Sequence, residues 1–147
     1  MILINRDITL ETFGLLIHGV NCKHKLGSGV ALAFKRKWPI IYTEYMCEES
    51  GKKMLGKLHI IKVADDLYVG NGYSQEFYGY DGKRYASVEA IDLILQKAFS
   101  WCHLNKIQLK SPKIGSKLGG LDWDTEVAPL FVKYETQFET QAEIYYI

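Results

Sequence analysis

Apolar and polar positions in the first forty residues predict a strand, a loop and a helix. The run Phe13-Gly14-Leu15-Leu16-Ile17 is typical of a buried strand. A polar stretch containing two close glycines, Gly27 and Gly29, follows it. One face of the predicted helix then carries apolar residues at helical spacing, namely Val30, Ala33, Phe34 and Trp38. Pro39 limits how far that helix can extend.

Strand and helix patterns continue to alternate along the rest of the chain. Strands are predicted at 1–4, 57–63, 67–69, 107–109 and 142–147, with 57–69 forming a hairpin. Helices are predicted at 40–47, at 87–104 behind the N-cap residue Ser87, and from about 124 to 134. This alternation predicts an α/β fold whose central mixed, largely parallel sheet is covered on both faces. We expect one domain that spans residues 1–147.

Composition narrows the class of protein further. The 147 residues are 48% apolar and carry a net charge of +1, so a real core is expected and non-specific nucleic-acid binding is not implied. The three cysteines form neither a zinc pattern nor a disulfide framework, which favours a reducing cytoplasm. No cationic leader and no apolar run of about 20 residues is present, so no membrane contact is expected. No carboxylate–histidine metal spacing is visible, so no metal or cofactor is expected.

Two glycine loops, each between a predicted strand and a predicted helix, are the candidate chemistry. The first covers residues 18–29 and the second covers 111–123. Backbone N–H groups at a helix N-terminus suit phosphate. The first loop is not a Walker loop, because no Gly-Lys-Ser/Thr ends it, and its glycine spacing does not fit a dinucleotide fingerprint. Because both loops leave strands at their carboxyl ends, together they match a diphosphate.

Three motifs in this order resemble the macro domain family. They are Asp7-Ile8-Thr9, then His-Gly-x-Asn-Cys at 18–22 with Gly-Ser-Gly-x-Ala at 27–31, then Ile-Gly-Ser-x-Leu-Gly-Gly-Leu-Asp-Trp at 114–123. The resemblance covers almost the whole chain and is nearest to the small ADP-ribose 1″-phosphate phosphatase-like branch of microbes and phages. It implies a three-layer α/β/α sandwich that binds ADP-ribose across the strand ends, in a monomeric protein of a bacterial or phage-infected cell.

The resemblance also implies roles for individual residues. Asp7 and Ile8 would contact adenine, and Asn21 would hydrogen-bond the distal ribose. The distal ribose and its phosphate would be wrapped by Leu26, Gly27, Ser28, Gly29 and Val30. The diphosphate would be cradled by the N–H groups of Ile114, Gly115, Ser116, Lys117, Leu118, Gly119, Gly120 and Leu121. Either Tyr145 or Tyr146 would stack on adenine.

Departures from the family bear on the reaction. The branch that removes ADP-ribose from glutamate or DNA carries a lysine after the middle strand and an aspartate in the second loop, whereas this chain has Tyr73-Ser74-Gln75 and Gly119 there. We therefore predict hydrolysis of ADP-ribose 1″-phosphate by an attacking water. The alternatives are a non-catalytic ADP-ribose reader, a hydrolase that removes ADP-ribose from protein or nucleic acid, and a structural protein whose loops bind nothing.

Several candidate residues keep two interpretations. Asn21 either contacts the ribose or caps its loop, and Gln75 either orients a water or holds its loop. His24 is a candidate acid or base because its ordinary pKa is near neutrality, but the sequence favours a solvated loop histidine. Lys25 and Lys117 either meet phosphate or point to solvent. Cys22 has no evident paired base and is not expected to be a nucleophile.

Overall fold

A six-stranded sheet forms the centre of the computed structural model, which describes residues 1–79, 81 and 83–147. The strands are β1 (Ile2–Asn5), β2 (Gly14–Asn21), β3 (Leu58–Ala64), β4 (Leu67–Gln75), β5 (Leu109–Pro112) and β6 (Ala142–Tyr146). Their order is β1-β6-β5-β2-β4-β3, and all neighbours are parallel except the β3–β4 hairpin. The predicted mixed, largely parallel sheet is confirmed.

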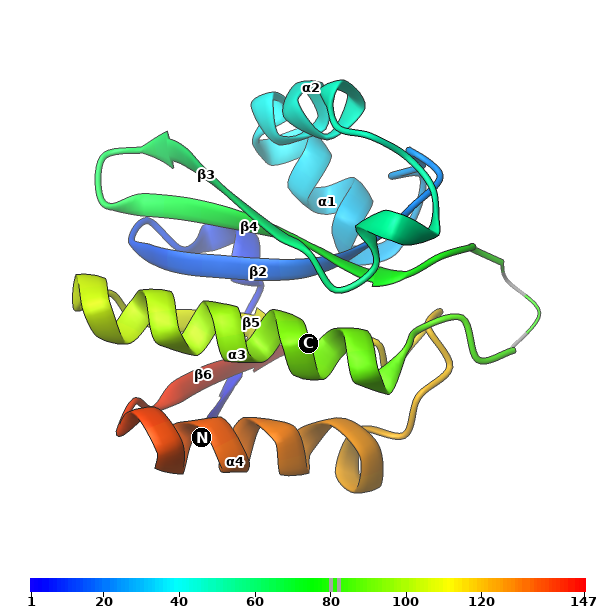
Figure 1. Ribbon diagram of the computed structural model, residues 1–147. Coiled ribbons are helices and arrows are strands. Elements are labelled where there is room, and N and C mark those ends of the chain that lie inside the picture. The colour runs from blue at the N-terminus through cyan, green and yellow to red at the C-terminus, as the bar shows by residue number, and fades with distance from the viewer. Residues whose placement is uncertain (80, 82) are drawn as a thin grey trace.

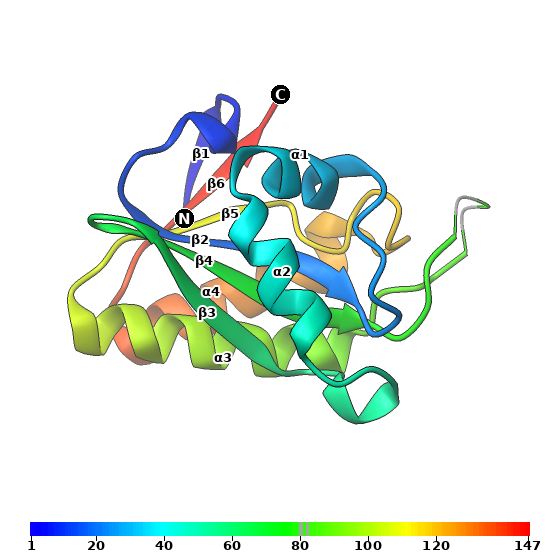
Figure 2. The same cartoon turned by 90° about the horizontal axis from the view of Figure 1, so that it is seen from above.

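Helices cover both faces of the sheet (Figures 1 and 2). Helices α1 (Gly29–Lys37) and α2 (Pro39–Cys47) lie on one face, and α3 (Val88–Asn105) and α4 (Ala128–Phe138) lie on the other. Short 3₁₀ turns occupy Ile8–Leu10 and Lys52–Met54, and a π-turn at Trp123–Val127 precedes α4. The predicted N-cap of α3 is confirmed, since Ser87 Oγ accepts from Ala90 N at 3.1 Å.

Side chains of β2 point alternately to the two faces of the sheet and contribute to two separate layers of the core. Leu15 and Ile17 pack with Ile91, Leu95 and Phe99 of α3, together with residues of α4. Leu16 points the other way and packs with α1 and α2 through residues such as Phe34, Trp38 and Ile41. Because successive strand side chains point to opposite faces, one continuous apolar run supplies both layers.

Several predicted boundaries are wrong, and the glycines explain two of them. Strand β2 continues past Ile17 to Asn21, and β4 continues past Val69 to Gln75, although Gly19, Gly70 and Gly72 indicated loops. These glycines are required by close packing inside the sheet: a Cβ at Gly72 would lie 2.9 Å from Ile94 Cγ2, and one at Gly70 would lie 2.9 Å from Leu58 Cδ1.

Other corrections concern the ends of elements. Phe13 precedes β2 and is 54% exposed, so it does not belong to the buried run. The strand predicted at 107–109 begins at Leu109 instead. The last helix begins at Ala128, which places Pro129 in its first turn, where the missing N–H costs no helical hydrogen bond.

Candidate functional site

A cleft of about 700 Å³ lies across the carboxyl ends of the parallel strands. Because β1, β6, β5, β2 and β4 run in the same direction, the segments that follow them meet at one edge of the sheet. The cleft is lined from both glycine loops, from the segment after β1, from the end of β6 and from the segment after β4. The lining segments are arranged along this edge in the order of their strands, from β1 and β6 at one end of the cleft to β2 and β4 at the other.

The first glycine loop ends at the N-terminus of α1. Its lining residues include all five that sequence reasoning selected, namely Leu26, Gly27, Ser28, Gly29 and Val30. Gly29 has φ of 60°, a conformation that glycine adopts without strain. Ser28 occupies the N-cap position but makes no side-chain cap hydrogen bond. Among the described residues, the N–H groups of Gly27, Ser28, Gly29 and Val30 have no hydrogen-bond partner and are free for an anion.

The second glycine loop faces the first across the cleft. Gly115 has φ of 77°, and a Cβ at Gly119 would lie 2.6 Å from the carbonyl oxygen of Gly115, so the loop backbone is tightly folded. Within the described residues, the N–H groups of Gly115, Lys117, Leu118 and Gly119 in this loop have no hydrogen-bond partner. The loop therefore presents a second set of anion donors.

The eight residues of the predicted diphosphate cradle, 114–121, are not all at the surface of the cleft. Residues 114–119 line the cleft, whereas Gly120 and Leu121 do not. Gly120 N donates to Lys117 O at 3.1 Å, and Leu121 N donates to Gly115 O at 3.0 Å. The Leu121 side chain is buried in the core beneath α3 and α4. These two residues therefore shape the loop from behind.

Asn21 lines the cleft at the end of β2, and its side chain is largely occupied by its own loop. Its Oδ1 accepts from Lys23 N at 2.9 Å and from Tyr45 Oη at 3.0 Å, and its Nδ2 donates to Lys25 O at 2.8 Å. The Tyr45 hydroxyl also donates to the Asn21 carbonyl oxygen. One N–H of the amide remains available to the cleft.

The opposite end of the cleft is formed by Asp7, Ile8 and the last strand. Asp7 Oδ1 accepts from Thr9 N at 2.9 Å and Thr9 Oγ1 at 2.8 Å, which leaves the second carboxylate oxygen available. Tyr145 and Tyr146 both line the cleft. Tyr145 is buried and donates its hydroxyl to Glu11 Oε1 at 2.6 Å, whereas Tyr146 is 42% exposed. Tyr146 therefore offers the more accessible ring of the two.

A buried ion pair supports this end. Lys110 Nζ donates to Glu11 Oε1 at 2.7 Å, and Arg6, which lines the cleft, approaches Glu11 Oε2 at 3.1 Å. Burial by itself would raise the pKa of the Glu11 carboxyl, but hydrogen bonds from Lys110 and Tyr145 outweigh it, so this pKa lies below its ordinary value. Glu11 is therefore ionised at neutral pH and joins β5, β6 and the segment after β1.

The three predicted catalytic residues are not all placed together. Gln75 lines the cleft beside Asn21, its partner in the β2–β4 register, and its Nε2 donates to Phe77 O at 2.7 Å. His24 does not line the cleft, and its ring lies edge-on to Tyr45 at 5.2 Å between centroids. Burial raises the pKa of the Cys22 thiol, which keeps it protonated and makes it a poor nucleophile.

Sequence reasoning missed the residues beneath the cleft. Glu11 and Lys110 are 99 positions apart, and Tyr45 lies in a helix whose apolar residues gave no indication of a polar role. Lys110 follows the strand predicted at 107–109, so no signal in the sequence indicated that its side chain would be buried in β5. In the described part of the chain, no cluster of three or more metal-ligating side chains occurs. None of the helices there is long and apolar enough to span a membrane.

Comparison with known proteins gave relatives in sequence and in structure. No family model matches the chain. A DNA ADP-ribosyl glycohydrolase of Mycobacterium tuberculosis is 28% identical over 136 residues, and one of Thermus aquaticus is 27% identical over 117. These matches cover 88% and 74% of this chain but 37% and 30% of the relatives, so the chain spans about a third of their length.

Solved structures resemble the chain over nearly its full length. The macrodomain of Mycobacterium tuberculosis DarG superposes with a TM-score of 0.79 at 24% identity, covering 98% of this chain and 95% of its own. Thermosipho africanus DarTG in complex with ADP-ribose gives a TM-score of 0.77 at 24% identity, covering 97% of this chain and 40% of its own. A Bacteroides thetaiotaomicron protein of unknown function gives 0.83 at 23% identity, with 98% and 96% covered. The chain therefore has the α/β fold of macrodomains.

Proposed function

We propose that this protein is a macro domain family member that binds ADP-ribose in the cleft and hydrolyses a bond at its distal ribose. The observation that carries the proposal is the pair of glycine loops, whose residues with unpartnered N–H groups line one cleft. A diphosphate taken out of water needs several such donors, because a desolvated charge without partners is costly. A solved structure of similar fold, Thermosipho africanus DarTG, is a complex with ADP-ribose.

The roles that the family resemblance implies for individual residues would give the ligand a direction along the strand order. Asp7, Ile8 and Tyr146 would receive adenine at the β1/β6 end, with the free Asp7 oxygen accepting from the exocyclic amine. The diphosphate would lie between the two glycine loops. The distal ribose would then lie at the β2/β4 end, where the remaining N–H of Asn21 can donate to a ribose hydroxyl.

The reaction that we favour is the removal of ADP-ribose from DNA, so the favoured substrate is ADP-ribosylated DNA. The curated relatives are named DNA ADP-ribosyl glycohydrolases. In this reaction a water oxygen forms a bond to C1″ of the distal ribose, and the bond from C1″ to the DNA breaks. The DNA leaves with the bonding electrons and takes up a proton. Gln75 Nε2 is held by Phe77 O, so its Oε1 is free to accept a hydrogen bond from that water.

A second candidate, hydrolysis of ADP-ribose 1″-phosphate, keeps the same binding mode. Lys25 and Lys117 line the cleft and have no ion-pair partner among the described residues. Two ammonium groups near the distal end would suit a terminal phosphate, and loop N–H groups would stabilise charge that develops on it. In that reaction water attacks phosphorus and ADP-ribose is the leaving group.

Gly27 provides a clean test of binding. A Cβ at Gly27 would meet no heavy atom within 4 Å, so a side chain fits there without a clash. We expect Gly27→Asp to weaken ADP-ribose binding at least tenfold in calorimetric titration, because a carboxylate would face the diphosphate. The isosteric variant Gly27→Asn is the matched control and should bind nearly as the wild type does. Unchanged binding in both variants would locate the diphosphate away from Gly27, whereas equal loss in both would mean that the side chain's bulk, and not its charge, blocks the ligand.

Two product assays on the wild type then separate the reactions. Release of ADP-ribose from a single-stranded oligonucleotide that carries one ADP-ribose would support the glycohydrolase. Release of inorganic phosphate from ADP-ribose 1″-phosphate would support the phosphatase. Tight binding with neither product would identify a non-catalytic reader, and no binding at all by folded protein would refute the proposed function.

A further inference from the structure

Two large aromatic side chains are exposed on the segment that follows β4. Phe77 is 54% exposed and Tyr78 is 44% exposed. Neither ring belongs to a core cluster within the described residues. An isolated exposed aromatic needs no explanation, but two adjacent ones beside a ligand cleft are typical of a recognition surface.

Contacts from both neighbouring strands hold this segment in place. Gln75 Nε2 donates to Phe77 O at 2.7 Å, which ties the backbone to the end of β4. Lys23, on the loop after β2, places its Nζ 4.7 Å from the centre of the Phe77 ring. A cation over an aromatic face at this distance is attractive. The Phe77 ring therefore has a defined position next to the first glycine loop.

The segment lies where the partner attached to the distal ribose would leave the cleft. Sheet order places the end of β4 beside the end of β2, at the end assigned to the distal ribose. Gln75 and Tyr78 line the cleft, whereas Phe77, between them, does not. The chain therefore passes from inside the cleft to its outer rim at Phe77, so a group bonded to C1″ would meet that ring.

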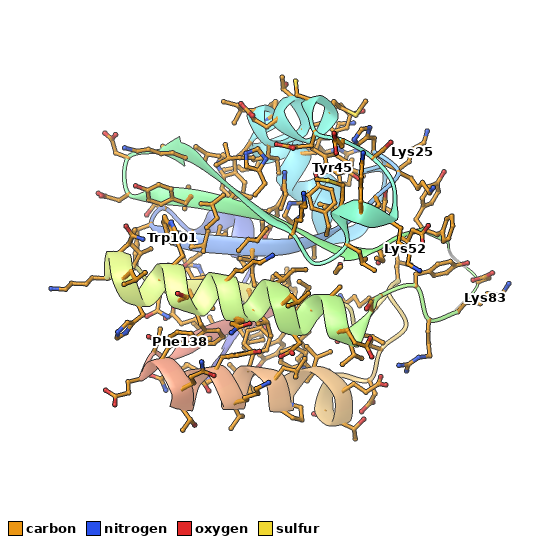
Figure 3. All side chains as sticks on the ribbon, viewed as in Figure 1. Lys25, Tyr45, Lys52, Lys83, Trp101 and Phe138 are labelled. Carbon is orange, nitrogen blue, oxygen red and sulfur yellow. The ribbon has the colours of Figure 1, made fainter. Side chains whose placement is uncertain are left out.

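Positive charge accompanies the two rings. Lys23 and Lys25 are exposed, and neither has an ion-pair partner in the part of the chain that is described. Lys83 lies at the same end of the molecule as Lys25 (Figure 3) and is 3.6 Å from Asp81. Against Lys23, Lys25 and Lys83 this part of the chain carries the acidic residues Glu76 and Asp81, so the local balance stays positive.

We propose that Phe77, Tyr78, Lys23 and Lys25 form an acceptor surface that holds single-stranded nucleic acid joined to the ADP-ribose; this deepens, and rests on, the proposed function. Every base has a face that can stack on an aromatic ring, and the lysines match the phosphates that flank it. A duplex would hide those base faces. The acceptor surface therefore favours an unpaired strand, with the modified nucleotide at the cleft and a neighbouring base on Phe77.

The test compares two ligands on matched variants. The ligands are free ADP-ribose and a single-stranded oligonucleotide that carries one ADP-ribose, with binding read by fluorescence anisotropy before any release. Phe77→Ala should weaken oligonucleotide binding by about 5- to 150-fold, the range measured for loss of one stacked base, and should leave free ADP-ribose binding unchanged. Phe77→Leu should fall between wild type and Phe77→Ala. The control Leu104→Ala, at a 77% exposed residue of α3, should change neither.

A salt titration tests the lysines separately. Lys23→Gln should lower the slope of log K against log salt for the oligonucleotide by about 0.7, the value for one phosphate contact to a single strand. The slope for free ADP-ribose should not change. An unchanged slope for the oligonucleotide would show that Lys23 serves only to hold Phe77.

Three other results would overturn the acceptor surface. Equal affinity of the wild type for both ligands would mean that the nucleic acid makes no contact. Equal weakening of both ligands by Phe77→Ala would mean that this ring covers the ADP-ribose itself. The third result would be an ADP-ribosylated peptide that binds more tightly than free ADP-ribose by as much as the oligonucleotide does, and that loses this gain in affinity in Phe77→Ala. That result would assign the surface to protein substrates. Failure of the wild type to bind free ADP-ribose would instead refute the proposed function and the acceptor surface with it.

Discussion

Beneath Asp7, at the β1/β6 end of the cleft, buried residues are joined by charged hydrogen bonds, whereas beneath Asn21, at the β2/β4 end, they are joined by neutral ones. At the first end Glu11 accepts from Lys110 and Tyr145 at 2.7 and 2.6 Å and lies 3.1 Å from Arg6. The contacts with Lys110 and Tyr145 connect segments that are 99 and 134 positions apart. Hydrogen bonds to charged groups are the stronger kind, so this end is firmly fixed.

At the β2/β4 end the contacts are neutral, and several buried polar atoms lack a hydrogen-bond partner among the described residues. At the charged end Glu11 Oε2, which Arg6 approaches, lacks one among those residues as well. Tyr45, which lies between α2 and the sheet (Figure 3), donates to both oxygens of Asn21. His18 Nε2 donates to Asn71 Oδ1 at 2.6 Å, and its Nδ1 has no partner among the described residues. The hydroxyl of Tyr73 and Nε2 of His24 are likewise buried there without a partner within the described chain.

The contrast matches the proposed direction of the ligand. Adenine is the same in every ADP-ribosylated substrate, so a rigid pocket at the β1/β6 end does not restrict which substrates can bind. In the proposed direction, the bond that breaks and the variable acceptor would lie at the β2/β4 end, where neutral groups adjust more readily. Buried charge also makes the rigid end the more sensitive to mutation, because removal of one partner leaves the other uncompensated.

Removal of the buried ion pair at the β1/β6 end should have the largest effect on the free energy of unfolding. Lys110 is fully buried against Glu11. We expect Lys110→Met to lower the free energy of unfolding by about 3 to 5 kcal/mol, because it leaves the Glu11 carboxylate buried without its main partner. Urea denaturation measures this. Lys133→Met is the matched control, since Lys133 makes an exposed ion pair with Asp92 at 3.3 Å and should lose under about 1 kcal/mol.

A double variant sharpens that result. Glu11→Gln combined with Lys110→Met removes both charges and should recover part of the lost free energy. If the double variant is as unstable as the sum of the two single variants, the pair is not coupled. The rigidity of the β1/β6 end would then come from apolar packing alone.

As the pH falls, the β2/β4 end should lose stabilising free energy before the β1/β6 end does. Burial lowers the pKa of His18 from 6.5 to about 4, despite its hydrogen bond to Asn71. The unfolded chain therefore binds a proton between these values that the folded chain does not, so the stabilisation is present above about pH 6.5 and is lost as the pH falls toward 4. At 1.36 kcal/mol per pKa unit, we expect a loss of about 2 kcal/mol by pH 5.

The contribution of Glu11 to stability depends on pH in a different range from that of His18. Its pKa is lowered in the folded protein, so its stabilisation is lost only below its ordinary value of 4.5. Urea denaturation from pH 7.5 to 5 should therefore report His18, and His18→Leu should remove most of the slope. A slope that persists in His18→Leu would assign the acid sensitivity to other groups.

The sequence predicted the elements whose signals are local. The helix at 87–104 was correct because its N-cap and its apolar spacing lie within one segment. The glycine loops were found for the same reason, since glycine spacing and neighbouring strands can be read directly. Strand ends at Asn21 and Gln75 were missed because Gly19, Gly70 and Gly72 indicate turns locally. Their actual requirement, close approach of Ile94, Leu58 and Ser74, becomes visible only in three dimensions.

The same distinction applies to the candidate site. The lining residues could be named from motifs, but the groups that hold them could not. Glu11 meets Lys110 across 99 positions, and Tyr45 meets Asn21 across 24. His24 was selected for its chemistry alone, and its positive φ of 60° together with the ring of Tyr45 places it behind the loop. Which side of a loop a residue faces depends on such contacts.

The smallest effect should come from a single hydroxyl at the neutral end. Tyr45→Phe removes both hydrogen bonds to Asn21 and keeps the buried ring. We expect about 1 kcal/mol lower free energy of unfolding, the usual net value for a neutral hydrogen bond. We also expect weaker ADP-ribose binding, because the Asn21 amide loses a contact that orients it. The matched control is Tyr42→Phe, one turn earlier in α2, whose hydroxyl makes no hydrogen bond within the described chain.

Comparing binding with stability in these two variants decides what Tyr45 does. A Tyr45→Phe protein that loses ADP-ribose affinity several-fold at a temperature where it is fully folded would show that the neutral end positions Asn21 for the ligand. Loss of stability with unchanged affinity would mean that Lys23 N and Lys25 O suffice to orient the amide. In that case the two ends of the cleft would differ in how they fold rather than in how they bind.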